Sequence, residues 1–246
     1  MKTRALILAA GKGKRMKSEK SKVLHEVMGK SLIEYVVDAL TIIEIERIAV
    51  IVSEQNRDEI RNILGSRVDY ILQNKQLGTG HAVLSAENWL LNFKGNIIVV
   101  AGDAPFLQRQ TVRNLLKEFY DKKSACVLLS AIYENPPAYG RVIRNKDGAV
   151  IKIVEEKDAS SDEKKIREVS SSHYCFDKEK LFSALKRVNN KNIQDEYYLP
   201  DVIEIFIKKG EKVEALPVND PLITFGINSP EDLQLAQKLM YSYNSI

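Results

Sequence analysis

The sequence predicts an α/β protein built on a doubly wound, mostly parallel β-sheet. Short β-branched runs alternate with longer segments of helical periodicity over the first 135 residues. The run Asn-Ile-Ile-Val-Val-Ala at 96–101 is continuously apolar, which is typical of a strand buried on both faces of a parallel sheet. A glycine-rich turn follows the first such run. Ligands of these sheets bind beyond the carboxyl ends of the strands, so the turn indicates a ligand site.

The alternation is regular throughout the first part of the chain. Strands are expected at 4–10, 47–53, 68–72, 96–101 and 125–133, with helices at 31–44, 56–64, 80–91 and 108–120. This order predicts successive βαβ units with right-handed crossovers.

The pattern changes after Pro136 and Pro137. Residues 141–145 and 149–155 flank Lys-Asp-Gly, which predicts a β-hairpin. Beyond it we expect an exposed polar loop at 158–165, a strand at 168–176, helices at 178–188 and 198–208, and a strand at 213–218. Ser229, followed by proline and two acidic residues, predicts the start of a last helix. We therefore divide a single domain, 1–246, at residues 135 and 228.

Composition excludes several classes of partner. The chain has 246 residues and a net charge of +4, which suits small polyanions but is too weak for nucleic-acid binding. No apolar segment reaches the roughly 18 residues that span a bilayer, and the apolar run after the basic start is too short for a signal peptide. Cys126 and Cys175 lie in apolar runs without metal-ligand spacing. We expect them to be reduced core residues of a cytoplasmic protein.

The glycine-rich turn, Leu-Ala-Ala-Gly-Lys-Gly-Lys-Arg-Met at 8–16, favours phosphate binding. Glycines let backbone N–H groups approach phosphate oxygens. It is not a P-loop, which ends in Gly-Lys-Ser/Thr, nor a dinucleotide fingerprint, because Met16 replaces the third glycine. Its cations are Lys12, Lys14, Arg15, Lys17, Lys20 and Lys22, against Glu19 alone. A cation within about 4 Å of a phosphate contributes about 4 kcal/mol of gross attraction. The alternative is a solvated basic loop, but the position beside the first strand favours phosphate.

A second segment, Gly-Asp-Ala-Pro at 102–105, ends the expected fourth strand. The carboxylate of Asp103 would face the ligand crevice, where Mg²⁺ takes one or two carboxylates together with substrate phosphates. The residues alone are equally compatible with an aspartate that caps the following helix.

A third segment, residues 73–82, follows the expected third strand. The amide of Gln73 can read the edge of a nucleobase, and Gly-Thr-Gly at 78–80 lets backbone approach a ligand. We interpret His81 as a structural residue at a helix start, and we assign no catalytic role to His25 or His173. An attacking phosphate is already ionised at pH 7, so no strong base is needed.

These three segments resemble the uridyltransferase half of bifunctional N-acetylglucosamine-1-phosphate uridyltransferases. Four further runs share the resemblance: Lys-Val-Leu-His at 22–25, Tyr-Gly-Arg at 139–141, Glu-Glu-Lys-Asp-Ala at 155–159 and Glu-Tyr-Tyr at 196–198. The resemblance covers almost the whole chain in order. It implies a Rossmann-like nucleotidyltransferase fold, with a nucleotide-binding half at 1–135, a small β-rich sugar-binding insertion within 136–228, and a C-terminal helix at 229–246. It also implies a Mg²⁺-dependent sugar-nucleotide pyrophosphorylase. Such an enzyme joins N-acetylglucosamine 1-phosphate to UTP, releasing pyrophosphate and the cell-wall precursor UDP-N-acetylglucosamine.

The resemblance also implies site residues, position by position. The nucleotide would contact Leu8, Ala9, Ala10, Gly11, Lys22, Gly102 and Asp103, and the uracil would contact Gln73, Gly78 and Thr79. Arg15, Lys22 and Asp103 would be catalytic, Asp103 and Asn228 would hold the metal, and Gly140, Glu155 and Ser170 would contact the sugar.

Three departures leave the exact substrates open. The resembled family usually has proline where this chain has Ser21, an aromatic residue where it has Ala101, and Asn-Thr-Gly where it has Ser-Ser-Ser at 170–172. Because serine offers a shorter polar group than asparagine, we expect weakened sugar selection. The alternatives are the same reaction on another sugar 1-phosphate, such as glucose 1-phosphate, or with another nucleotide, and a non-catalytic nucleotide-sugar-binding subunit. Retention of Arg15, Lys22, Asp103 and Asn228 argues against the last.

The sequence contains no hexapeptide repeat of the kind that forms a trimeric left-handed β-helix. We therefore expect a monomer or a weak homo-oligomer that binds only small-molecule substrates. The chain is either the uridyltransferase part of a bifunctional protein or a stand-alone pyrophosphorylase.

Overall fold

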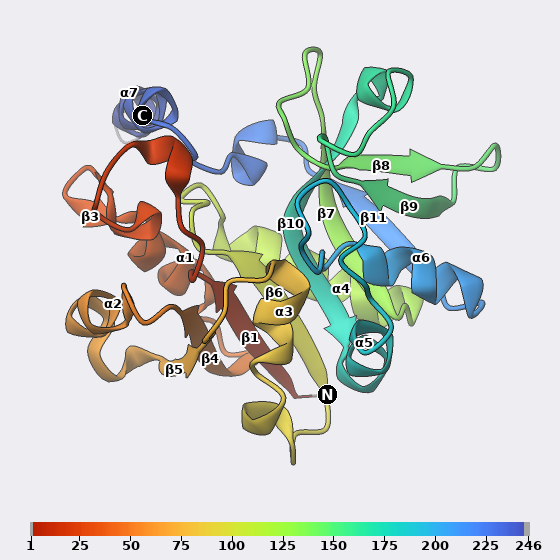
Figure 1. Ribbon diagram of the computed structural model, residues 1–246, viewed down its shortest axis with the longest axis horizontal. Helices are drawn as coiled ribbons and strands as arrows, with labels where there is room; N and C mark the ends of the chain where they lie inside the picture. The colour runs from red at the N-terminus through yellow and green to blue at the C-terminus, as the bar shows by residue number, and fades with distance from the viewer. Residues whose placement is uncertain (1, 244–246) are drawn as a thin grey trace.

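A mixed β-sheet forms the centre of the computed structural model, which describes residues 2–243 (Figure 1). The strand order is β11-β7-β10-β6-β1-β4-β5. The bounds are β1 Thr3–Leu8, β4 Ile45–Val52, β5 Asp69–Leu72, β6 Asn96–Ala101, β7 Cys126–Ile132, β10 Glu168–Asp177 and β11 Val213–Pro217. β1 pairs in parallel with β4 and β6, and β4 in parallel with β5. The predicted α/β class with a mostly parallel sheet is confirmed.

β10 is the exception to the parallel arrangement. It lies between β6 and β7 and is antiparallel to both, with Cys175 opposite Ile98 on one side and Val127 on the other. The predicted strand at 168–176 is thus confirmed, but it belongs to the middle of the main sheet. Its residues 173–176 are fully or almost fully buried, which explains why it enters the core. The alternation of strands and helices did not show that an antiparallel strand separates β6 from β7.

Helices cover both faces of this sheet. On one face lie α1 (Leu32–Leu40), α2 (Arg57–Leu64) and α4 (Arg109–Lys122), and on the other α3 (Thr79–Leu84), α5 (Lys178–Leu185) and α6 (Asp201–Lys208). Each face has its own hydrophobic core. The single helix expected at 80–91 is wrong: α3 ends at Leu84, and a 3₁₀ turn follows at Asn88–Leu90.

The predicted hairpin is confirmed as β8 (Arg141–Arg144) and β9 (Val150–Val154). β8 also pairs with β10, where Val169 lies opposite Arg141, so the hairpin is anchored on the main sheet. The polar segment at 158–165 is mostly exposed, as expected, and includes a short 3₁₀ turn.

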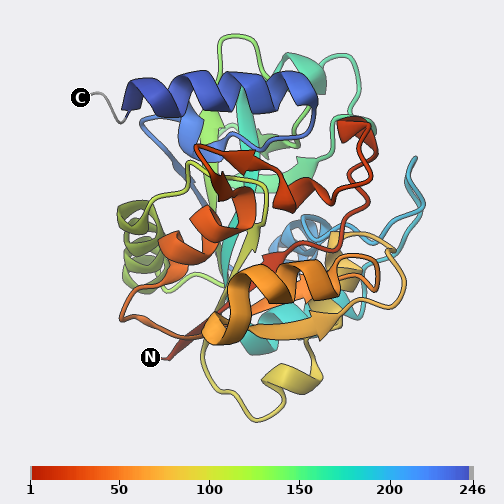
Figure 2. The ribbon, with the colours of Figure 1, turned by 90° about the vertical axis from the view of Figure 1, so that its left-hand side faces the viewer.

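The last helix, α7 (Pro230–Tyr243), lies across one end of the molecule (Figure 2). It contacts β2 (Glu26–Val27), which pairs with β3 (Lys30–Ser31) in a small second sheet that the sequence pattern did not reveal. A third core joins these elements: Met16, Val27, Leu32, Phe106, Ile227, Ala236 and Met240. This core fixes the loop after β1 beside the segment before α7. Residues 244–246, which the prediction included in the helix, lie outside the described residues.

Cys126 and Cys175 are free and completely buried in the sheet, as the sequence predicted. Burial raises the pKa of both thiols well above the usual value, so they stay protonated. Across residues 2–243 no helix combines the length and the apolar character that crossing a membrane requires.

Candidate active site

A cavity of about 700 Å³ opens at the carboxyl ends of the central strands. The predicted site residues that line it are Leu8, Ala9, Ala10, Gly11, Arg15, Lys22, Gln73, Gly78, Thr79, Asp103, Gly140, Glu155, Ser170 and Asn228. Gly102 is not part of the lining. Its backbone N–H donates to the Leu8 carbonyl at 3.0 Å, and a Cβ there would lie 3.0 Å from the same oxygen. Gly102 therefore joins the ends of β6 and β1 rather than facing the cavity.

The loop after β1 is held from below by a buried amide. The Nδ2 of Asn56 donates to the Ala9 carbonyl at 2.8 Å and to Ser21 Oγ at 3.0 Å, while its Oδ1 accepts from the Ser53 N–H at 2.9 Å. Asn56 thus connects the glycine-rich turn to the segment that carries Lys22. Sequence reasoning missed Asn56, because nothing in its local pattern shows that it reaches residues more than thirty positions away.

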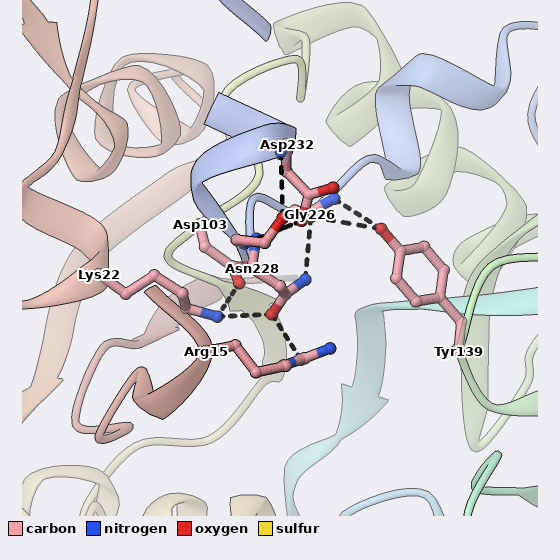
Figure 3. A network of polar contacts seen from close by, with 8 residues as sticks. Arg15, Lys22, Asp103, Tyr139, Gly226, Asn228 and Asp232 are labelled. Atoms are coloured by element: carbon pink, nitrogen blue, oxygen red, sulfur yellow. Dashed lines mark hydrogen bonds and ion pairs between the residues drawn. The ribbon is translucent and has the colours of Figure 1, made fainter. Parts of the chain in front are cut away.

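A cluster of two cations and two oxygen-bearing side chains lies in the cavity wall (Figure 3). The Nζ of Lys22 donates to Asp103 Oδ2 and to Asn228 Oδ1, the latter at 3.0 Å. Arg15 Nη2 donates to the same Asn228 oxygen at 2.9 Å. Asp103 is 7% exposed, and its ion pair with Lys22 compensates a carboxylate that is largely shielded from water.

The orientation of Asn228 is fixed by its neighbours. Its Nδ2 donates to the Gly226 carbonyl at 2.9 Å, so Oδ1 points to the cations. The backbone N–H of Asn228 donates to Asp232 Oδ2 at 2.9 Å, and the predicted Ser229 cap is confirmed because Ser229 Oγ accepts from the Asp232 N–H. Tyr139 accepts from the Gly226 N–H at 2.9 Å.

Tyr139 and Asp232 are therefore positioning residues that the sequence did not single out as such. Tyr139 lies in the Tyr-Gly-Arg segment, and Figure 3 shows it reaching across to the segment before α7. Asp232 belongs to a capping motif that was recognisable, but only the fold shows that the capped turn carries Asn228.

Gln73, Gly78 and Thr79 form one end of the cavity, called the base end below after the expected contact with a nucleobase. The side chain of Gln73 is held there in one orientation. It is 4% exposed, and its Nε2 donates to the Gly78 carbonyl at 3.2 Å and lies 3.0 Å from His81 Nδ1. Burial, together with nearby Lys75, lowers the pKa of His81, so a neutral imidazole accepts this bond. The expectation that His81 is structural fits this arrangement, since its contact fixes the amide that faces the cavity.

The Gly-Thr-Gly turn is fastened to the segment before α6. The Gly80 N–H donates to the Tyr197 carbonyl at 2.7 Å, and the Leu199 N–H donates to Thr79 Oγ1 at 2.9 Å. Gly78 has φ +104°, and a Cβ there would meet the Tyr197 carbonyl at 2.7 Å. A side chain at Gly78 would thus be both strained and obstructed.

The opposite end of the cavity is rich in carboxyl groups. Burial, followed by the charges of Asp201, Asp158 and Glu196, raises the pKa of Glu155 to about 7. Gly140 lies against it: a Cβ at Gly140 would approach Ile153 Cγ2 at 3.0 Å and Glu155 Oε1 at 3.5 Å. This end therefore offers closely packed backbone and the partly protonated carboxyl group of Glu155, which suit a neutral polar ligand.

Ser170 lines this end but keeps its hydroxyl within the protein. Its Oγ lies 3.1 Å from the Tyr174 hydroxyl, its backbone N–H donates to the Gly140 carbonyl at 2.8 Å, and it is 5% exposed.

The donor set permits a simple metal site. Within residues 2–243 no three His, Cys, Asp or Glu side chains gather to bind a metal. However, oxygens of Asp103 and Asn228 converge on one cation, the Lys22 ammonium. Mg²⁺ needs only one or two protein carboxylates when substrate phosphates complete its shell. Asp103 and Asn228 therefore fit a metal that is bound together with its substrate.

These features define a nucleotide-handling α/β enzyme, and comparison with known proteins agrees. The chain belongs to the nucleotidyl transferase family, whose model matches residues 4–221.

Among curated proteins, the bifunctional protein GlmU of Halalkalibacterium halodurans is 46% identical over 236 residues, or 96% of this chain and 52% of the relative. GlmU of Bacillus subtilis is 44% identical over the same shares of the two chains. This chain spans about half the length of these relatives. The resemblance inferred from its motifs is confirmed, and the chain is an enzyme of the nucleotidyltransferase type.

The fold also matches a crystal structure from Bacillus anthracis, of a protein assigned as a glucose-1-phosphate thymidylyltransferase, in complex with a sucrose. The TM-score is 0.78 at 23% sequence identity, over 96% of this chain and 94% of the other. The likeness supports the architecture described above.

Proposed function

We propose that this protein transfers a uridylyl group from UTP to N-acetylglucosamine 1-phosphate. A phosphate oxygen of the sugar 1-phosphate attacks the α-phosphorus of UTP, and the bond from that phosphorus to the oxygen bridging to the β-phosphate breaks. The products are UDP-N-acetylglucosamine and pyrophosphate. The attacking oxygen is already ionised at pH 7, so no protein base has to remove a proton.

One observation carries the proposal. The cation–oxygen cluster, the base-end residues and the carboxyl-rich end all line the same cavity. A nucleotide bound along the loop after β1 would place its phosphates beside Arg15 and Lys22. A sugar phosphate entering from Glu155 would meet them there. The relatives named GlmU support the choice of uridylyl donor and acetylated sugar.

The residues of the chain act by positioning and by charge. Lys22 and Arg15 neutralise phosphate oxygens, which approach the α-phosphorus with the acceptor in line. Gln73 faces the base with its amide fixed by His81. His173 is fully buried and its pKa is lowered to about 4 by burial, so it is neutral at pH 7 and contributes no charge to the reaction.

Asp103 and Asn228 would hold Mg²⁺. When bound, the metal would neutralise charge on the triphosphate and orient it. In this structure both oxygens accept from Lys22, so Lys22 has to release them and turn to the phosphates.

We further infer a cytoplasmic monomer or weak homo-oligomer, a nucleotide-binding half at 1–135 and a sugar-binding half at 136–228. The free, buried cysteines support the compartment, and the anchoring of β8 and β9 on β10 supports a single domain. Light scattering after gel filtration tests the oligomeric state.

The activity is tested by measuring pyrophosphate release from UTP, dTTP, CTP and GTP, each with N-acetylglucosamine 1-phosphate and with glucose 1-phosphate. We expect the highest kcat/KM for UTP with N-acetylglucosamine 1-phosphate, and no turnover after Mg²⁺ is removed by chelation. A higher kcat/KM for another pair would contradict the assigned substrates. Nucleotide binding without turnover for any pair would indicate a non-catalytic subunit.

A further inference from the structure

The strand β10 is interrupted by a bulge beside the cavity. Ser170 lies opposite Ser130 of β7 and Tyr174 lies opposite Leu128, so the three residues 171–173 face the single residue Leu129. Bulges of this kind often re-aim a side chain next to an active site. Residue 172 is at the centre of this one.

Ser172 has a backbone conformation that serine seldom adopts. Its φ is +59°, in the left-handed region. The described residues other than glycine with positive φ are Lys17, Met28, Lys123, Ser172 and Asp195. Of these, Ser172 alone belongs to the cavity lining. Strain in such a region persists where surrounding structure enforces it, and it concentrates at functional sites.

The three consecutive serines of the bulge use their hydroxyls differently. Ser170 Oγ pairs with the Tyr174 hydroxyl, and Ser171 Oγ donates to the Leu129 carbonyl at 2.9 Å; both residues are buried. Ser172 is exposed, and within residues 2–243 its hydroxyl has no protein partner. A polar group held in a strained conformation at a cavity wall without a partner is free to bind a ligand.

The position of Ser172 indicates which part of the ligand it meets. On one side, the Ser170 N–H donates to the Gly140 carbonyl at the carboxyl-rich end. Ser172 also lines the same cavity as Asp103 and Asn228 of the cation–oxygen cluster. Ser172 is therefore placed in a cavity that holds both this cluster and the end that suits a neutral polar ligand.

We propose that the Ser172 hydroxyl forms a hydrogen bond with a hydroxyl of the acceptor's sugar ring and thereby helps to determine which sugar 1-phosphate is used. This inference rests on the proposed transfer to a sugar 1-phosphate. A serine hydroxyl both donates and accepts, which matches a sugar hydroxyl. Ser172 lines the cavity, and its strained backbone conformation is maintained there at the expense of stability.

The test separates strain from recognition with two variants and a control. Ser172→Gly removes both the strain and the hydroxyl, whereas Ser172→Ala removes the hydroxyl and keeps the strain. The matched control is Lys123→Gly, because Lys123 is exposed, has φ +51° and ends α4. Lys123 is not part of the cavity lining. Each protein is assayed for Tm and for kcat/KM with N-acetylglucosamine 1-phosphate, glucose 1-phosphate and monodeoxy analogues of the better acceptor.

We expect both Ser172 variants to lower acceptor kcat/KM about three- to tenfold, the value of one hydrogen bond, with the KM for the nucleotide unchanged. Ser172→Gly and Lys123→Gly should each raise Tm by about 2–4 °C, and only Ser172→Gly should also lose activity. The loss in Ser172→Ala should vanish for the one deoxy analogue that lacks the contacted hydroxyl.

An active wild-type protein whose Ser172 variants keep acceptor kcat/KM within about twofold would overturn the inference alone. An equal loss for every deoxy analogue would also overturn it, because the effect would then be structural. A wild-type protein without turnover for any acceptor would overturn the proposed function, and the inference with it.

Discussion

The two ends of the cavity are built in opposite ways. At the end that we propose binds the nucleotide, neutral backbone and amide groups lie beside two cations, and buried Asn56 and Gln73 hold the loops. At the other end, burial and neighbouring carboxylates raise the pKa of Glu155 to about 7 and that of Asp201 to about 6. The charged side chains that line the cavity thus change from basic at one end to acidic at the other. We therefore expect the charged end of an elongated substrate to bind beside the two cations.

The largest expected effect is at the junction of the two ends. Asp103→Ala removes the carboxylate that would hold Mg²⁺, and we expect kcat to fall at least about a hundredfold, since metal charge stabilisation is worth several kcal/mol. Thermal unfolding should remain cooperative, because Asp103 contributes little apolar packing. Asp147→Ala, in the exposed hairpin turn, is the control. Turnover close to wild type at saturating Mg²⁺ would refute the role of Asp103.

Replacing Arg15 and replacing Lys22 should change different kinetic parameters. Arg15→Ala should lower kcat by about ten- to a hundredfold with a smaller change in KM, because we propose that Arg15 acts mainly on the transition state. Lys22→Ala should raise the KM for UTP by about tenfold. Steady-state kinetics with varied UTP distinguish the two patterns. If neither variant changes, the basic loop is merely solvated and the contrast between the two ends has no functional meaning.

The carboxyl-rich end should make stability depend on pH. The pKa of Glu155 is raised from 4.5 to about 7, so between these values the native state binds more protons than the unfolded state. Stability contributed by protonated Glu155 is present below about pH 4.5 and is lost as pH rises through about 7. From pH 5 to pH 8 the Tm of wild type should fall by about 5 °C more than that of Glu155→Gln.

Asp201, Asp158 and Glu196, whose charges help to raise the pKa of Glu155, are present in both proteins, so the comparison isolates the change at residue 155. Parallel Tm profiles for wild type and Glu155→Gln would show that Glu155 is ionised like an exposed carboxylate. The two ends of the cavity would then differ less than the structure indicates.

The smallest expected effect concerns the hydrogen bonds by which Asn56 holds the loop after β1. Ser21→Ala removes one acceptor of Asn56 Nδ2, which keeps its bond to the Ala9 carbonyl. The loss of one hydrogen bond costs about 0.5–1.5 kcal/mol, so Tm should fall by about 2–4 °C with kcat unchanged. Exposed Ser66→Ala is the control. A fall in kcat without a fall in Tm would instead place Ser21 in the catalytic machinery.

Sequence reasoning succeeded where the signal is local. The strands at 4–10 and 96–101 and the hairpin around residues 146–148 follow from apolar runs and turn residues within a few positions. Site residues that directly follow such strands, such as Asp103, could be placed in the crevice because parallel strands end at a common edge. The motifs and the resemblance together pointed to fourteen residues that line one cavity, with Gly102 the exception.

The features that sequence reasoning missed depend on contacts between residues that are distant in the chain. The position of β10 between β6 and β7 depends on which partners complete the sheet, and its own pattern is compatible with any neighbouring strands. Asn56, Tyr139 and Asp232 act on residues brought close only by folding. Burial, and then the charge of Asp201 that lies 46 positions away in the chain, raises the pKa of Glu155.

The three serines at 170–172 show most clearly which features follow from the sequence and which follow only from the tertiary structure. The sequence by itself determined that Ser-Ser-Ser stands where the resembled family has Asn-Thr-Gly, and this pointed to Ser170. Only the tertiary structure decided that Ser170 turns to Tyr174 and that Ser172 faces the cavity, at a φ that glycine adopts freely. The physical reason is that side-chain identity is a property of each position, whereas the direction of a side chain in a bulge is set by the register of two strands distant in sequence.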